Sequence, residues 1–349
     1  MRYDFVVVGS GIAGLSVSHM LAERGYKVAL VGIPELTSIV ASSSSGILTY
    51  HMPEPFISWA FETLKYYLRL EDSIIEVVDS LWFSRELMFM SSVVNKLLEE
   101  GVKAKYVSID YAREFLGNIK LFDDENIVHI EGYRINIKRL IDTLITKIRE
   151  LNVEVKSRWG NITMEGVRVG SDIIRGDIIV AAGPWSIDLV ETQNIIVYRC
   201  QAVRLEEPRI NVMVIDDTIG YYVNKAYDNT IALGDGIKLV VNRPEEALKP
   251  DDSITIEVLE RARKRGLISK YKIAYIASAP CVGTGDSYPL VGRLREGLYI
   301  LTAFDGVGFS IAPALASMLV DYIDKGSKLP LEADPLRKIS SREPIEPID

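Results

Sequence analysis

The chain opens with a strand, a glycine-rich loop and a helix, and this pattern constrains the fold more than any other feature of the sequence. Residues 3–8 are almost uniformly apolar and β-branched or aromatic, which predicts a strand buried on both faces of a parallel sheet. The loop Gly9-Ser10-Gly11-Ile12-Ala13-Gly14 follows directly and opens a helix that Gly25 ends. Residues 27–31 begin a second strand. These elements predict the first βαβ unit of an α/β domain.

A glycine loop in this position is suited to bind a dinucleotide. The first glycine permits a tight turn, the second lets the backbone approach a pyrophosphate, and the third allows the helix to pack on the strand. The helix N-terminus adds free N–H groups and partial positive charge. The residues expected to contact the dinucleotide are Gly9, Ser10, Gly11, Ile12, Ala13 and Gly14.

One part of the dinucleotide-binding pattern is missing. A carboxylate that accepts the ribose hydroxyls usually ends the second strand, about 20 residues after the loop. Here Gly32, Ile33 and Pro34 follow that strand, and Glu35 is the nearest carboxylate. Three possibilities stay open: Glu35 binds the ribose, a backbone group near Gly32 binds it, or the adenosine is held more loosely.

Three further segments are expected to contact a cofactor. The serine run at 42–45 suits a packed loop that faces a ligand, with a flexible linker as the alternative. Residues 173–182 predict a buried strand that ends in small residues, and residues 299–303 predict a strand followed by a glycine loop and a helix. The expected contacts are Ser42, Ser43, Ser44, Ser45, Gly46, Ile47, Ala182, Gly183, Trp185, Asp305, Gly306, Val307, Gly308 and Phe309.

The middle of the chain is expected to supply helices and an antiparallel sheet. Apolar spacing is helical from Pro55 to Leu98, with an interruption at 82–84, and residues 137–151 predict an amphipathic helix. Between residues 195 and 237, segments of period two alternate with turn-like pairs such as Asp216-Asp217, which predicts an antiparallel sheet.

The charge balance argues against several classes of partner. The chain has 349 residues and a formal net charge of -8, without the clustered Lys and Arg that bind a phosphate backbone. The apolar stretch at 304–321 is interrupted by Asp305 and Pro313 and falls short of the about 20 residues that span a membrane. We expect no nucleic-acid partner, no transmembrane helix and a cytoplasmic location. Abundant Ile, Val and charged residues suit a thermophilic source.

Taken in order, these segments resemble the D-amino-acid oxidase-like (DAO) superfamily of FAD-dependent oxidoreductases, which includes glycine oxidase, sarcosine oxidase and amino-acid dehydrogenases. The matching stretches are 5–31, 42–48, 132–151, 178–186, 199–205, 221–234 and 284–313. The resemblance implies a mixed α/β fold: a Rossmann-type FAD-binding domain with an inserted antiparallel-sheet substrate domain. The implied boundaries are 1–78, 136–196 and 283–335 for the FAD domain, 79–135 and 197–282 for the substrate domain, and 336–349 for a C-terminal tail.

The resemblance also implies an enzyme that moves a hydride from a carbon bonded to nitrogen onto flavin N5, with a small amine or amino acid as substrate. Two alternatives remain open. One is oxidation of a 2-hydroxy acid on the same fold, and the other is an accessory subunit of a larger flavin dehydrogenase. The electron acceptor and the state of homo- or hetero-oligomerisation also stay open.

Substrate contacts follow from the same resemblance. Strand alternation lets only one of Tyr221 and Tyr222 point toward the flavin. The arginine that binds a substrate carboxylate in glycine oxidase-like relatives is replaced here by Cys281. The candidate substrate contacts are Tyr221, Tyr222, Arg199, Cys281 and His51, with Lys225 as a second candidate cation.

The two cysteines of the chain, Cys200 and Cys281, both fall at positions that the resemblance places near the flavin. Buried, unbonded side chains are expected first, because free cysteine is among the most often buried residue types. A disulfide between the two is one alternative. Covalent attachment of the flavin through Cys281 is the other.

Overall fold

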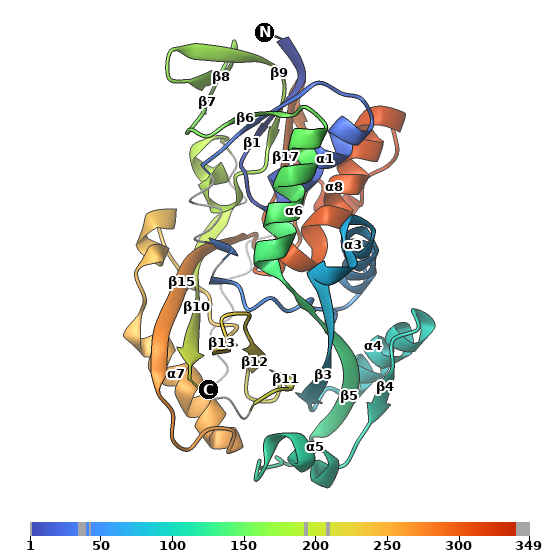
Figure 1. Cartoon of the computed structure of the whole chain (residues 1–349), viewed down its shortest axis with the longest axis vertical. Coiled ribbons are helices and arrows are strands. Elements are labelled where there is room, and N and C mark those ends of the chain that lie inside the picture. Colours follow the sequence, from blue (N-terminus) through green and yellow to red (C-terminus); the bar gives the residue numbers. More distant parts are fainter. Residues whose placement is uncertain (1, 34–39, 42, 192–194, 207–209, 340–349) are drawn as a thin grey trace.

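The structure is a computed structural model that describes residues 2–33, 40–41, 43–191, 195–206 and 210–339. Its elements form two sheets, one above the other in Figure 1, with a group of helices beside the upper sheet. Each sheet is assembled from segments that lie far apart in the sequence. The predicted mixed α/β fold is therefore confirmed. The predicted domain boundaries stay a prediction.

The upper sheet has the strand order β16-β17-β9-β1-β2-β6 and is parallel except for β16 at its edge. Its strands are β1 (Arg2–Val8), β2 (Val28–Val31), β6 (Glu154–Lys156), β9 (Asp172–Val180), β16 (Leu290–Arg295) and β17 (Leu298–Thr302). A hairpin of β7 (Asn161–Thr163) and β8 (Gly166–Val169) joins the sheet through antiparallel pairing of β8 with β9. Val7 and Val8 of β1 belong to different apolar clusters, so β1 is buried on both faces, as predicted.

Four helices gather beside this sheet, as Figure 1 shows: α1 (Ile12–Glu23), α3 (Phe56–Leu70), α6 (Ile137–Glu150) and α8 (Gly308–Lys325). Helix α1 contacts both α6 and α8, and α3 contacts α8. On α6, Leu140, Leu144 and Ile148 are buried at helical spacing, which confirms the predicted amphipathic helix.

The lower sheet has the order β14-β10-β13-β12-β11-β3-β5-β4, with β15 paired to β10. Its strands are β3 (Ile75–Ser84), β4 (Ala104–Tyr106), β5 (Asn126–Ile135), β10 (Ile196–Leu205), β11 (Met213–Asp216), β12 (Tyr221–Lys225), β13 (Ile231–Asp235), β14 (Leu239–Val240) and β15 (Ile273–Gly283). All pairs are antiparallel except β11 with β3. Helix α7 (Asp252–Arg265) contacts β10, β12 and β13. In Figure 1, α4 (Leu87–Glu99) lies beside β4, and α5 (Ile109–Leu116) lies at the lower end of β5.

The prediction of helix was wrong for residues 75–81. That segment is the first part of β3, which pairs with β5 over ten residues from Ile75 to Ser84. Its apolar spacing is compatible with either helix or strand, and pairing with a segment about 50 residues away decides the outcome. Within the rest of that segment, residues 56–70 form α3 and residues 87–98 belong to α4, as predicted.

No helix within the described part of the chain is long and apolar enough to cross a membrane.

Candidate active site

A cavity of about 570 Å³ lies between the two sheets. On one side it is lined by residues that follow the carboxyl ends of β1, β2, β9 and β17, among them Gly9, Gly32, Ala182 and Asp305. On the other side it is lined by β10, β12 and β15 of the lower sheet. Ligands of doubly wound α/β proteins bind outside the carboxyl ends of the parallel strands, so the position fits a nucleotide cofactor.

The glycine loop after β1 has the geometry that a pyrophosphate requires. A Cβ atom on Gly9 would lie 2.2 Å from the carbonyl oxygen of Ala181, and one on Gly14 would lie 1.8 Å from the carbonyl oxygen of Gly9. A Cβ atom on Gly11 would have no atom within 4 Å, and Gly11 itself lines the cavity. Helix α1 starts at Ile12 without a side-chain cap, so its first N–H groups remain available to an anion.

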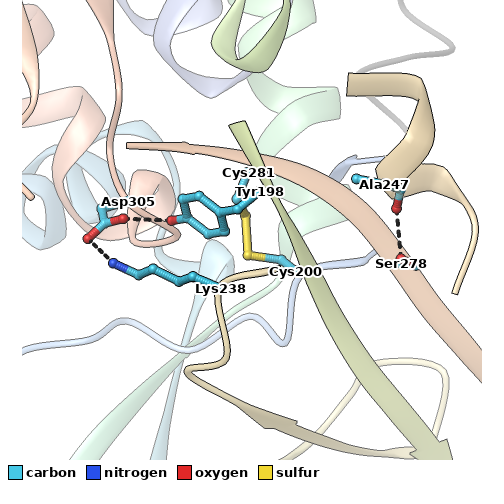
Figure 2. The surroundings of a disulfide bond; sticks show 7 residues. All are labelled: Tyr198, Cys200, Lys238, Ala247, Ser278, Cys281 and Asp305. Carbon is cyan, nitrogen blue, oxygen red and sulfur yellow. Dashed lines mark hydrogen bonds and ion pairs between the residues drawn. A yellow bond between two sulfur atoms is a disulfide. The ribbon is translucent and has the colours of Figure 1, made fainter. Parts of the chain in front are cut away.

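A second loop of this kind precedes α8 and is tied to the lower sheet. Asp305 has a φ of +52° and accepts hydrogen bonds from the Tyr198 hydroxyl at 2.7 Å and from Lys238 Nζ at 2.6 Å, as Figure 2 shows. Helix α8 begins at Gly308 without a side-chain cap. The loop therefore presents helix N–H groups to the cavity from a fixed position.

The described part of the serine run, residues 43–45, is a packed segment and not a linker. Arg204 of β10 donates to the Ser44 carbonyl at 2.9 Å, and Asn224 of β12 donates to the Ser45 carbonyl at 2.7 Å. The Gly46 carbonyl accepts from the Ile135 backbone N–H at 2.7 Å. Hydrogen bonds from three strands, β5, β10 and β12, thus hold this segment at the wall of the cavity.

The cysteines correct the first-ranked expectation of unbonded side chains. Cys200 and Cys281 form a disulfide with a Cα–Cα distance of 5.8 Å, and both line the cavity. The pairing of β10 with β15 places Cys281 opposite Tyr198, so the two cysteines are diagonal neighbours on one face. The disulfide joins β10 to β15, and the hydrogen bond between Tyr198 and Asp305 lies beside it (Figure 2). With both thiols bonded to each other, Cys281 has no thiol for covalent attachment of a flavin.

Arg199 does not lie where a substrate cation is needed, which corrects that expectation. Strand alternation turns Arg199 to the face of β10 opposite Cys200. There it is paired with Asp251 at 3.3 Å and donates to the Glu246 carbonyl at 2.9 Å. Lys225 is likewise absent from the cavity lining and donates to Asn211 at 3.3 Å.

The two tyrosines of β12 face opposite sides of the sheet. Tyr221 is buried in the apolar cluster that includes Val258 of α7, and burial raises the pKa of its hydroxyl well above the usual value. Tyr222 lies over Gly234, where a Cβ atom would come within 2.3 Å of its hydroxyl oxygen. Asn224 shares the Tyr222 face and bonds the serine loop, so the Tyr222 side chain points toward that loop, and both tyrosines border the cavity.

Sequence reasoning missed the most unusual group in the cavity, the carboxylate of Asp217. The indole N–H of Trp82 donates to Asp217 Oδ2 at 2.6 Å, and burial raises the Asp217 pKa to about 6, with the charge of Asp216 adding to the shift. His51 packs edge-on against Trp82 with ring centroids 4.9 Å apart. Burial lowers the His51 pKa to about 3, so its ring is neutral at physiological pH. Only the acidic pair at the end of a period-two segment hinted at this site in the sequence.

Most of the residues expected at the site line the cavity. These are Gly9, Ser10, Gly11, Ile12, Ala13, Ser43, Ser44, Ser45, Ile47, His51, Ala182, Gly183, Trp185, Tyr221, Tyr222, Cys281, Asp305, Gly306, Val307, Gly308 and Phe309. Gly14 and Gly46 lie behind the lining, packed against backbone. Glu35 and Ser42 lie outside the described residues, so the choice between Glu35 and the backbone at Gly32 for the ribose stays open. Within the described ranges no group of three or more His, Cys, Asp or Glu could hold a metal ion.

Comparison with known proteins identifies the chemistry that this cavity supports. The family model described as "DAO: FAD dependent oxidoreductase" matches residues 4–322. Glycine oxidase of Bacillus licheniformis is 32% identical over 357 residues, which cover 92% of this chain and 93% of that protein.

Solved structures show the same fold at lower identity. L-proline dehydrogenase from P. horikoshii superposes with a TM-score of 0.81 at 21% identity, covering 96% of this chain and 97% of that chain. Glycine oxidase from Geobacillus kaustophilus superposes with a TM-score of 0.79 at 16% identity, covering 97% and 100%.

Proposed function

The chain belongs to the DAO family of FAD-dependent oxidoreductases, and from this premise we propose that it oxidises the C–N bond of a small amine or amino acid. Membership makes the chain an FAD-dependent enzyme that acts on amino acids or amines. The bond that is oxidised and the direct transfer of hydride belong to the proposal. The relatives named above support it, since their names include glycine oxidase and L-proline dehydrogenase.

The residues present fit FAD. The loop at 9–13 and the N-terminus of α1 would hold the pyrophosphate, because Gly11 leaves open a space that a side chain would fill. The loops at 43–47 and 305–309 would hold the flavin end of the cofactor. Bound FAD supplies an acceptor for two electrons and a proton from the substrate carbon.

The protein's own contribution to the reaction is placement and exclusion of water. Tyr222, Ile215 and Cys281 border the part of the cavity lined by the lower sheet, and Trp185 closes it near the end of β9. The Trp185 indole donates to Glu245 at 2.8 Å, which fixes the orientation of its ring. A donor carbon held between these walls is kept in reach of the cofactor and away from bulk solvent.

The observation that carries the proposal is a single cavity with two different walls. The loop at residues 9–13, called the pyrophosphate cradle below, lies at one wall, and titratable side chains lie at the other. An accessory subunit without flavin has no need of the open cradle at Gly11. Oxidation of a 2-hydroxy acid remains the second candidate on the same fold.

The test is anaerobic bleaching of the flavin in the purified holoenzyme. Primary and secondary amines, D- and L-amino acids and 2-hydroxy acids are added in turn, with visible flavin absorbance as the readout. We expect one or more nitrogen compounds to reduce the flavin. Reduction by hydroxy acids alone would contradict the proposal, and a preparation that takes up no FAD would contradict the enzyme's cofactor as well.

A further inference from the structure

We propose that the end of the cavity formed by Asp217, His51 and Trp82 binds the positively charged ammonium group of the substrate, and that the substrate is an amine without a carboxylate beside the oxidised carbon. This inference rests on the proposed function and narrows it from amines and amino acids to amines. The three residues are referred to below as the Asp217 cluster.

The cluster is built from three separate segments of the chain. Trp82 is fully buried in β3 and connects the other two members, because its indole N–H bonds Asp217 and its ring contacts His51. The parallel pairing of β11 with β3 sets Asp216 opposite Phe83, which brings the following residue, Asp217, alongside β3. The backbone N–H of Asp217 donates to the Phe83 carbonyl at 2.9 Å, so the carboxylate is held by both main chain and side chain.

Asp217 combines an exposed side chain with a fixed hydrogen-bond donor. It lines the cavity and belongs to the exposed residues of the protein. Its Oδ2 accepts the single side-chain hydrogen bond described for it, from Trp82. A partly desolvated carboxylate with one fixed donor is stabilised by a cation that approaches from the open side.

The charges around the cavity favour a cation over an anion at this end. The described cationic side chains that line it are Arg158 and Lys238. Lys238 is paired with Asp305 at 2.6 Å, and Arg158 follows β6 in the upper sheet. A substrate carboxylate placed beside Asp217 would meet like charge, which is unfavourable in a partly desolvated site.

His51 is the independent indication that a ligand completes the site. Both ring nitrogens of His51 are buried and have no hydrogen-bond partner within the described residues. Buried polar atoms without partners are uncommon in native proteins, and a bound ligand is one way to satisfy them. A neutral imidazole can accept an N–H from an ammonium group through one nitrogen, so the unpartnered ring suits the same class of ligand.

Isosteric probes test the inference on the holoenzyme. tert-Butylammonium and pivalate have nearly the same shape and opposite charge, and tert-butylammonium has no hydrogen on the carbon that bears nitrogen, so it is not oxidised. Isothermal titration calorimetry near neutral pH measures the affinity of each. We expect tert-butylammonium to bind about tenfold or more tightly than pivalate. Tighter binding of pivalate, or no binding of either probe, would overturn the inference.

Variants locate the binding to the cluster. Asp217→Asn keeps an oxygen that can accept from Trp82 and removes the charge, so tert-butylammonium affinity should fall about tenfold or more. The matched control is Asp123→Asn, an exposed carboxylate outside the cavity, which should leave affinity unchanged. Equal affinities in wild type and Asp217→Asn would overturn the assignment.

The pH dependence of binding provides a readout that a purely structural role would not change. Besides Asp217, the titratable or charged groups among the described residues that line the cavity are His51, Arg158, Tyr198, Asp216, Tyr221, Tyr222, Lys238 and Asp305. Asp216 is paired with Arg265 at 2.7 Å, and His51 stays neutral above its lowered pKa of about 3. Asp217 must be ionised to bind a cation, and its pKa is about 6. As the pH drops from about 6 to about 5, the affinity for tert-butylammonium should therefore fall, with a slope that approaches about tenfold per pH unit.

This slope should be absent in Asp217→Asn, and a slope that persists in the variant would contradict the inference.

The outcomes separate this inference from the proposed function. Flavin content and anaerobic bleaching by any amine or amino acid test the function. Probe selectivity tests only the charge of the substrate site.

Discussion

The two walls of the cavity are built from different parts of the backbone and side chains. The wall at the upper sheet is made by main chain: Gly9, Gly11 and Gly183 leave room or permit turns, and helix N-termini supply donors. The wall at the lower sheet is made by side chains from strands far apart in sequence, including Asp217 and Cys281. The comparison indicates that the residues proposed to hold FAD depend on local backbone geometry, and that those proposed to recognise the substrate depend on which strands pair.

The difference extends to what stabilises each wall. The lower sheet is fastened by a buried ion-pair network and a disulfide, in which Arg265 contacts Asp216 and Glu125, and Cys200 bonds Cys281. The upper wall depends on close packing of glycine against main chain. Changes in the ion-pair network or the disulfide should therefore alter stability, and changes at open positions of the upper wall, such as Gly11, should alter cofactor affinity.

The largest expected effect is on stability, from Arg265→Met. Arg265, Asp216 and Glu125 have fully buried side chains, with Arg265 Nε 2.7 Å from Asp216 and Nη1 2.6 Å from Glu125. Removing the cation leaves two buried carboxylates uncompensated and should lower the free energy of unfolding by about 3 to 5 kcal/mol. Urea denaturation measures this loss of unfolding free energy. The control Arg263→Met, exposed on the same helix, should change it by less than about 0.5 kcal/mol, and equal effects would contradict the contrast.

The disulfide gives the next largest effect. The bond closes a loop with a sequence separation of 81 residues, so the double variant Cys200→Ser with Cys281→Ser should lose about 2 to 4 kcal/mol of unfolding free energy. Urea denaturation of the wild type with and without reductant provides the control, because reductant should destabilise the wild type and leave the double variant unchanged. A wild type that is insensitive to reductant after full reduction of the bond would refute this role.

Gly11→Val should act on the cofactor and leave the fold intact. Its side chain would project into the open space of the cradle, so FAD affinity should fall about 100-fold, or about 2.7 kcal/mol. Unfolding of the FAD-free variant should match that of the FAD-free wild type. Gly14→Val provides the contrast, because its Cβ would lie 1.8 Å from the Gly9 carbonyl oxygen and should impair folding itself. Titration with FAD, monitored by flavin fluorescence, measures the first effect; unchanged affinity in Gly11→Val would break the comparison.

The smallest expected effect comes from the pair that joins the two walls, Lys238 and Asp305. Lys238 is 46% exposed and Asp305 is 14% exposed, so solvent screens their attraction. Lys238→Met should cost about 0.2 to 1 kcal/mol, and less in high salt. Thermal unfolding at low and high ionic strength measures the loss. A larger loss that does not depend on salt would show that Lys238 acts through packing.

The sequence was sufficient where structure depends on neighbouring residues. The roles of Gly9, Gly11 and Gly14 follow from a motif of six residues between a strand and a helix, and the structure has those elements. The serine loop and the helix at 137–150 were also predicted, because each has a local pattern.

Prediction failed where distant segments decide the outcome. Residues 75–81 were assigned to a helix because their pairing with β5 cannot be read locally. The expectation that Arg199 faces the substrate failed because the register and direction of β10 are set by its pairing with β15 and β13. This pairing cannot be read from the local sequence. Asp217 was visible only as part of a turn, since its environment depends on Trp82 in a strand more than 100 residues earlier.

Binding of FAD at residues 9–13 is the property on which the proposed activity of this protein depends most directly. Competition between FAD and ADP for the FAD-free protein tests it, because ADP carries the same pyrophosphate and adenosine. We predict saturable binding of one FAD per chain, with ADP as a competitor for the same site. Failure to bind FAD, or FAD binding that ADP does not displace at any concentration, would contradict the account.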